Sequence, residues 1–152
     1  GAPITVRDAV NRAYDNGILV VAAAGNSGTT DYGYPASYDS AISVSAVNSD
    51  EEWAPFSNEN DQVELSAPGV DVLSTCIEKE GFYCVLDGTS MASPHVAVST
   101  IYLSNHYLTA NLCSNCLTYI RFPHMNTLNS SYSYDNILGR GCYHLVSLSW
   151  LY

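Results

Sequence analysis

The sequence has very few basic residues. Five of its 152 residues are Lys or Arg and fifteen are Asp or Glu, which gives a net charge of −10. A surface that binds nucleic acid or anionic lipid headgroups needs clustered basic side chains. We therefore expect neither a nucleic acid nor a membrane among the partners of this chain.

Long apolar runs are absent as well. No eighteen consecutive residues are apolar, so the sequence predicts no transmembrane helix. The opening Gly-Ala-Pro-Ile has neither the basic nor the apolar region of a signal peptide. That absence carries no weight if the chain is part of a longer precursor. The length suits one domain with a substantial core.

Five cysteines form an odd set, namely Cys76, Cys84, Cys113, Cys116 and Cys142. The first two flank a polar stretch, and either a disulfide across a hairpin or two reduced, buried thiols would suit them. Cys113 and Cys116 have the spacing of a redox motif or of half a zinc site. No second such pair follows them, which disfavours a metal there.

The first half of the chain predicts an α/β fold. Residues 3–14 predict a helix, with Thr5 as a possible cap. Residues 18–24 are continuously apolar and rich in β-branched side chains, which is typical of a strand buried on both faces of a parallel sheet. Residues 41–47 alternate like a strand. Further on, we expect strands at 63–65 and 70–75, separated by a turn at 66–69.

The stretch Gly-Thr-Ser-Met-Ala-Ser-Pro-His-Val-Ala, residues 88–97, predicts a turn that opens a helix. Pro94 is tolerated in the first helical turn. Ser90 would then lie near the helix N-terminus, where the dipole places about half a positive charge. That position suits a serine that attacks a carbonyl and forms an oxyanion, but it also suits an ordinary helix cap.

Asn26 follows the strand at 18–24 within Gly-Asn-Ser-Gly. Ligands in open α/β sheets gather at the carboxyl ends of strands, so Asn26 lies where chemistry is expected. The same four residues would also make a simple turn.

Together, GTSMASPHVA and VVAAAGNSG resemble motifs of the subtilases, the subtilisin-like serine proteases. The similarity extends from about residue 4 to Ala97. It implies a subtilisin-like, mostly parallel sheet with flanking helices, incomplete in this chain. It also implies that Ser90 is the nucleophile and that the amide of Asn26 binds the oxyanion, whereas His95 is not the catalytic base.

The stretch GYPASYDSAISVSAV is similar to the subtilase segment that lines the primary specificity pocket. By this resemblance Ser27 and Gly33 would help to shape the pocket. Some subtilases also bind calcium or another cation through backbone carbonyls here, which would correspond to Ala36, Tyr38 and Ala41.

The family pattern also shows what is missing. Subtilases carry the catalytic Asp and His upstream of the nucleophile, whereas the four histidines of this chain all lie after Ser90. The composition changes near residue 98, since fourteen of the fifteen acidic residues precede it. We therefore interpret residues 1–98 as the C-terminal half of a catalytic domain and 99–152 as a divergent tail. That tail could be a diverged terminal region or an unusual coding product.

The sequence thus favours a fragment of a serine endopeptidase that acts on peptides or proteins in the extracellular space or the secretory pathway. A missing N-terminal segment would supply Asp and His, so we expect little or no activity from this chain alone. Two alternatives stay open: an inactive, protease-like peptide-binding protein, and a truncated product without function.

Overall fold

The computed structural model describes residues 2–77, 81–107 and 144–148, with side chains described up to Thr100. The chain begins with helix α1 (Ile4–Asp15) and continues into strand β1 (Ile18–Ala23). Pro3 is the N-cap of α1 and no side chain caps the helix, so the expected cap at Thr5 is wrong. Gly17, with φ of +75°, makes the tight turn between the two elements.

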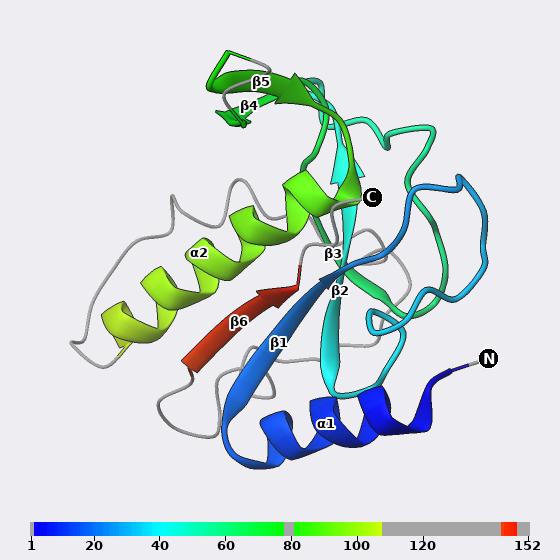
Figure 1. Ribbon diagram of the computed structural model, residues 1–152, viewed down its shortest axis with the longest axis vertical. Helices are drawn as coiled ribbons and strands as arrows, with labels where there is room; N and C mark the ends of the chain where they lie inside the picture. The colour runs from blue at the N-terminus through cyan, green and yellow to red at the C-terminus, as the bar shows by residue number, and fades with distance from the viewer. Residues whose placement is uncertain (1, 78–80, 108–143, 149–152) are drawn as a thin grey trace.

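The central sheet has four strands in the order β3-β2-β1-β6. Strands β2 (Ala41–Val47), β3 (Val63–Pro68) and β6 (His144–Leu148) join β1 through pairings that are all parallel. Figure 1 shows these strands side by side, with α1 beyond one end of β1. The α/β class with a mostly parallel sheet is thus confirmed.

Strand β3 is longer than the sequence suggested. It continues through Ser66 and Ala67 to Pro68, which lies opposite Val47 of β2, so the turn expected at 66–69 is wrong. Proline is tolerated here because β3 is an edge strand and ends at this residue.

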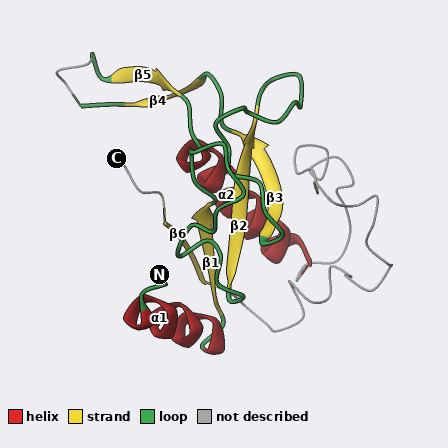
Figure 2. Ribbon diagram, turned by 90° about the vertical axis from the view of Figure 1, so that its right-hand side faces the viewer, coloured by secondary structure: helices red, strands yellow, loops and turns green. Residues whose placement is uncertain are grey.

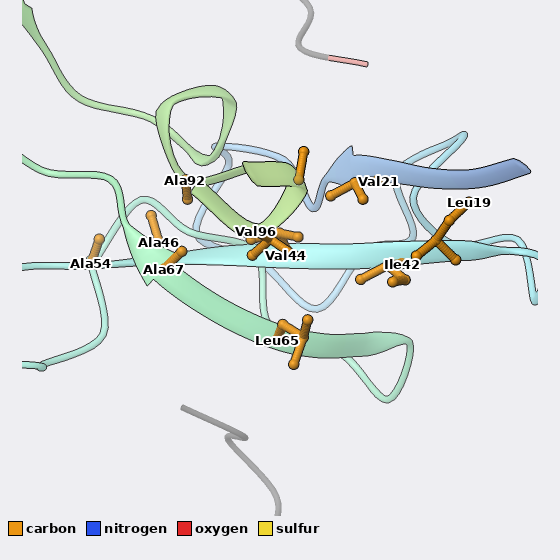
Figure 3. Close-up of a cluster of buried hydrophobic side chains, with 11 residues drawn as sticks. Leu19, Val21, Ile42, Val44, Ala46, Ala54, Leu65, Ala67, Ala92 and Val96 are labelled. Atoms are coloured by element: carbon orange, nitrogen blue, oxygen red, sulfur yellow. The ribbon is translucent and has the colours of Figure 1, made fainter. Parts of the chain in front are cut away.

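The two faces of the sheet are covered by different helices. Helix α2 (Thr89–Tyr107) packs on one face, where Val21, Val44 and Val96 are fully buried. Figure 3 shows Val96 of this helix lying against Val44. On the other face, Val10 of α1 packs against Val20 of β1. Since Val20 and Val21 are neighbours on one strand, their side chains point to opposite faces, and the two cores lie on either side of the sheet.

Along the chain, a two-stranded hairpin lies between strand β3 and helix α2. Strands β4 (Val72–Thr75) and β5 (Tyr83–Leu86) pair antiparallel, and a disulfide joins Cys76 to Cys84, whose Cα atoms are 5.8 Å apart. Of the two states that the sequence allowed for these cysteines, the oxidised one is therefore present. Figure 2 shows the hairpin projecting from the sheet.

Several sequence-based predictions concern residues that the structure does not describe. They include Cys113, Cys116 and most of the proposed tail 99–152, whose boundary stays a prediction. Within the described ranges, no helix is both long and apolar enough to cross a membrane.

Candidate functional site

The site is built where the hairpin passes into α2, at Gly88, Thr89 and Ser90 (Figure 1). The loop is anchored at its start, because the Gly88 N–H donates to the Gly69 carbonyl at 2.8 Å. Gly69 in turn leaves no space for a side chain, since a Cβ there would lie 2.6 Å from the Cβ of Ala46 and 2.7 Å from the Gly88 oxygen. Ser90 is thus held in the first turn of α2, near the positive end of the helix dipole.

Thr89 fixes the side chain of Asn26, which comes from the loop after β1. The Thr89 backbone N–H and hydroxyl donate to Asn26 Oδ1 at 2.9 Å and 2.8 Å. A backbone N–H can only donate, so its partner on Asn26 must be the oxygen. The amide nitrogen Nδ2 is therefore the group left to face away from Thr89. Thr89 itself is fully buried, and its Oγ1 accepts a hydrogen bond from the Gly25 N–H at 3.2 Å.

The amide of Asn26 and the backbone nitrogen of Ser90 border the same small space next to Gly88. A Cβ built on Gly88 would lie 3.4 Å from Asn26 Nδ2 and 3.7 Å from the Ser90 nitrogen. Because residue 88 is glycine, no side chain lies between these two nitrogens and the backbone of residue 88. Two N–H donors close to each other and to a serine are the kind of groups that stabilise the oxyanion of acyl transfer.

The two residues predicted to shape the specificity pocket, Ser27 and Gly33, follow strand β1 in the chain. Ser27 is exposed, and its N–H donates to Oδ1 of Asn58 at 2.9 Å. Gly33 packs against the end of β1, where a Cβ would lie 2.9 Å from the Ala24 carbonyl oxygen. The structure thus brings both residues to the carboxyl end of β1, near Asn26, and their role in a pocket stays a prediction.

Of the residues proposed to bind a cation, Ala36 and Tyr38 lie in the turn before β2, and Ala41 is the first residue of β2. Ala36, Tyr38 and Ala41 are all buried, and the Tyr38 carbonyl accepts a hydrogen bond from the Ala41 N–H at 2.9 Å. A carbonyl oxygen has two lone pairs, so that bond still leaves one for a ligand. No group of three or more His, Cys, Asp and Glu side chains suited to a metal occurs within the described part of the chain. Within this part of the chain, any cation here would need backbone oxygens among its ligands.

His95 is the one histidine whose side chain is described. Its ring is exposed, and Nδ1 lies 2.8 Å from the Met91 carbonyl oxygen one turn earlier on α2. Asp87, the acid nearest to Ser90 in sequence, accepts a hydrogen bond from the Asp71 N–H at 2.7 Å. Both groups thus have structural partners, and that His95 is not the catalytic base stays a prediction.

Sequence reasoning missed two residues of this site. Thr89 stands inside the recognised motif, but its hold on Asn26 needs the loop after β1 to lie beside α2, a contact between residues 63 positions apart. Asn58 lies within the stretch that resembles the family, just before an acidic segment, but its local sequence assigns it no role in the site. Only the folded chain shows that it contacts the loop of Asn26.

Known proteins have sequences similar to that of this chain. A model of the family described as "Subtilase family" matches residues 1–114. Subtilisin DY of Bacillus licheniformis is 48% identical over 108 residues, which are 68% of this chain and 39% of that protein. A protein named intracellular serine protease, from Paenibacillus polymyxa, is 47% identical over 97 residues, 60% of this chain and 29% of that protein.

Among solved structures, the psychrophilic subtilisin-like protease Apa1 from Pseudoalteromonas sp. AS-11 shares 55% identity, with a TM-score of 0.48 over 49% of this chain and 17% of that chain. This chain therefore spans well under half the length of the relatives it matches. Since the family model covers most of the 152 residues, the chain belongs to the subtilase family.

Proposed function

We propose that this chain is the C-terminal part of a serine endopeptidase domain and that Ser90 is its nucleophile. One observation carries the proposal: Asn26 Nδ2 and the Ser90 nitrogen both lie within 4 Å of the position that a Cβ of residue 88 would take. Family membership supports the same reaction class. The substrate is a peptide or protein.

The geometry supports one mechanism. Ser90 Oγ attacks the scissile carbonyl as a general base takes its proton, and the carbonyl oxygen becomes an oxyanion between Asn26 Nδ2 and the Ser90 N–H. The C–N bond then breaks as the base passes this proton to the leaving amine, which leaves an acyl-enzyme on Ser90. Water attacks the acyl carbon as the base takes a proton from it, and this proton returns to Ser90 Oγ when the acid is released. In subtilisin, loss of the side-chain donor costs about 10²–10³ in kcat, a measured value that we adopt here rather than derive.

The general base and its orienting carboxylate would come from an upstream segment that this chain does not contain. In subtilisin, loss of the catalytic His alone costs about 2 × 10⁶ in kcat. A comparable deficit would leave the isolated chain with almost no turnover.

We extend the proposal to a cation and a compartment. Calcium or another weakly held cation would bind the carbonyls of Ala36, Tyr38 and Ala41 and stiffen the turn before β2. Raised thermal stability in calcium or potassium chloride, reversed by chelator or dialysis, would support this. The relatives do not decide the compartment, since one is named intracellular. The Cys76–Cys84 disulfide favours an oxidising one, such as the secretory pathway or the extracellular space.

The test is to restore the missing groups. The upstream part of Subtilisin DY, which carries its catalytic Asp and His, is fused before residue 2, and hydrolysis of a fluorogenic peptide is measured. We expect turnover by the fusion, loss of turnover in Ser90→Ala, and normal turnover in Ser99→Ala on the same helix. The isolated chain serves as the inactive reference.

Other outcomes would contradict the proposal. Turnover by the isolated chain that depends on Ser90 would show that the base lies within these 152 residues. A folded fusion that binds peptide with equal affinity in the presence and absence of Ser90, but never cleaves it, would support a binding protein instead.

A further inference from the structure

Asn58 is a buried polar residue to which the sequence analysis gave no role, and only 5% of its surface is exposed. It lies between the bridge at Trp53 and strand β3. Its neighbour Ser57 fixes this segment to the sheet, because Ser57 Oγ accepts a hydrogen bond from the Ala46 N–H of β2 at 3.0 Å. Asn58 is therefore attached to a rigid part of the fold.

From that position Asn58 contacts the Asn26 loop, residues 25–31, at three points. Its N–H donates to the Gly25 carbonyl at 2.9 Å, and its Oδ1 accepts from the Ser27 N–H at 2.9 Å. Its Nδ2 donates to the Asp31 carbonyl at 3.3 Å. The first two contacts lie on either side of Asn26, so they fix the backbone from which its amide projects.

Gly25 shows how closely the loop is drawn against Asn58. A Cβ on Gly25 would lie 2.7 Å from Asn58 Nδ2, and the residue has φ of +116°. Only glycine combines this conformation with this approach. The Gly25 N–H is also bound by Thr89 Oγ1 at 3.2 Å. Gly25 is therefore held between Asn58 on one side and the nucleophile loop on the other.

We infer that Asn58 is a positioning residue for catalysis: it acts through the backbone of Gly25 and Ser27 to aim the amide of Asn26 at the oxyanion. This inference rests on the proposed function for its catalytic part. Asn58 itself touches no reacting atom. A displacement of about 1 Å in a positioned group can cost about 10²-fold in rate, so the expected loss in kcat without Asn58 is about ten- to hundredfold.

The test compares Asn58→Ala with Asn60→Ala. Asn60 is a matched control because its Nδ2 also donates to the Asp31 carbonyl, at 3.1 Å, whereas its Oδ1 accepts from the Gln62 N–H rather than from Ser27. In the restored protease described above, we expect Asn58→Ala to lower kcat with little change in KM. The Ki of a substrate-like peptide aldehyde, which forms the oxyanion, should rise by the same factor, whereas Asn60→Ala should change neither.

A merely structural role would give a different pattern. Partial unfolding lowers the number of active sites found by titration but leaves the aldehyde Ki of the remaining enzyme unchanged, and that result would overturn the inference. If Asn58→Ala does not fold, Asn58→Asp replaces it, because the carboxylate keeps the acceptor for the Ser27 N–H but loses the donor to Asp31. This variant should keep the Ser27 contact and most of the loop order.

A second measurement does not depend on proteolysis. In the 152-residue chain, NMR relaxation of the Asn26 side-chain Nδ2 and hydrogen exchange of the Ser27 amide report the order of the loop directly. We expect at least tenfold faster Ser27 exchange and lower Nδ2 order in Asn58→Ala, with neither change in Asn60→Ala. Unchanged Nδ2 order in folded Asn58→Ala would refute the positioning role, even if the proposed protease activity is established.

Discussion

Replacement of Gly88 by alanine tests whether the space beside it holds the oxyanion. A Cβ at this position would lie 3.4 Å from Asn26 Nδ2 and 3.7 Å from the Ser90 nitrogen. An oxyanion bound by both donors must lie about 2.7–3.1 Å from each of them. Two non-bonded heavy atoms prefer a separation of about 3.5–4.0 Å, so the methyl group and the oxyanion compete for one place.

The magnitude follows from the donors that the oxyanion would lose. Loss of one donor costs about 10²–10³ in kcat, or about 2.7–4 kcal/mol, and the methyl group borders both donors. We therefore expect Gly88→Ala in the restored protease to lower kcat at least about 10²-fold. Its contacts with Asn26 and with Met91 Sδ, at 3.4 Å and 3.5 Å, are close to ordinary packing distances, so KM should change much less. Gly88 has a positive φ, of +157°, so a backbone cost of about 1–3 kcal/mol in stability is expected as well.

The control is Gly81→Ala, in the hairpin. Gly81 also has a positive φ, of +90°, but a Cβ there would meet no atom within 4 Å. This variant carries a comparable backbone cost of about 1–3 kcal/mol without filling any space. If Gly88→Ala keeps kcat within about threefold of the parent, or if Gly81→Ala loses as much activity, the space beside Gly88 is not the oxyanion site.

Three further predictions concern stability. Val96 is fully buried between α2 and the sheet. Its replacement by alanine should lower the free energy of unfolding by about 2 kcal/mol, as measured by urea unfolding with an unchanged m-value. Desolvation raises the pKa of Glu64 from 4.5 to about 7, although the residue is largely exposed on edge strand β3. The folded state therefore binds this proton more tightly than the unfolded chain, and stability falls as pH rises from about 4.5 to about 7. Glu64→Gln should match the parent at pH 4 and exceed it by about 1 kcal/mol at pH 8 in the same urea assay, a value reduced for solvent screening; equal curves at both pH values would refute this. Reduction of the Cys76–Cys84 disulfide, which spans 8 residues, should lower the free energy of unfolding by about 2.5 kcal/mol, and no shift in the melting temperature with reductant would contradict that.

The sequence predicted the elements whose signals are local. The run at 18–24 is apolar on both sides of the strand, and the chain has helices on both faces there. The prediction failed where tertiary context decides. Pro68 suggested a turn, but an edge strand accommodates it, and Thr5 suggested a cap, but the helix begins earlier at Ile4.

The candidate site shows the same division. Ser90 and Asn26 stand in recognisable motifs, so a resemblance was enough to single them out. The groups that hold them come from contacts across the fold: Thr89 bonds to Asn26 across 63 residues, and Asn58 bonds to Ser27 across 31. No local pattern in a single sequence encodes such distances, and a buried asparagine in an acidic loop looks like any surface residue until the chain is folded.

The closed base of the hairpin has a consequence for how this protein can change. Gly88 and Gly69 are hydrogen-bonded to each other, and Gly69 packs closely against Ala46 of the sheet. The end of β3 and the start of α2 are therefore connected directly, independently of the hairpin residues between them. Insertions, deletions or new side chains in the hairpin can therefore accumulate while Ser90 keeps its place. The hairpin is thus a segment that evolution or protein engineering can vary next to the candidate site without moving Ser90.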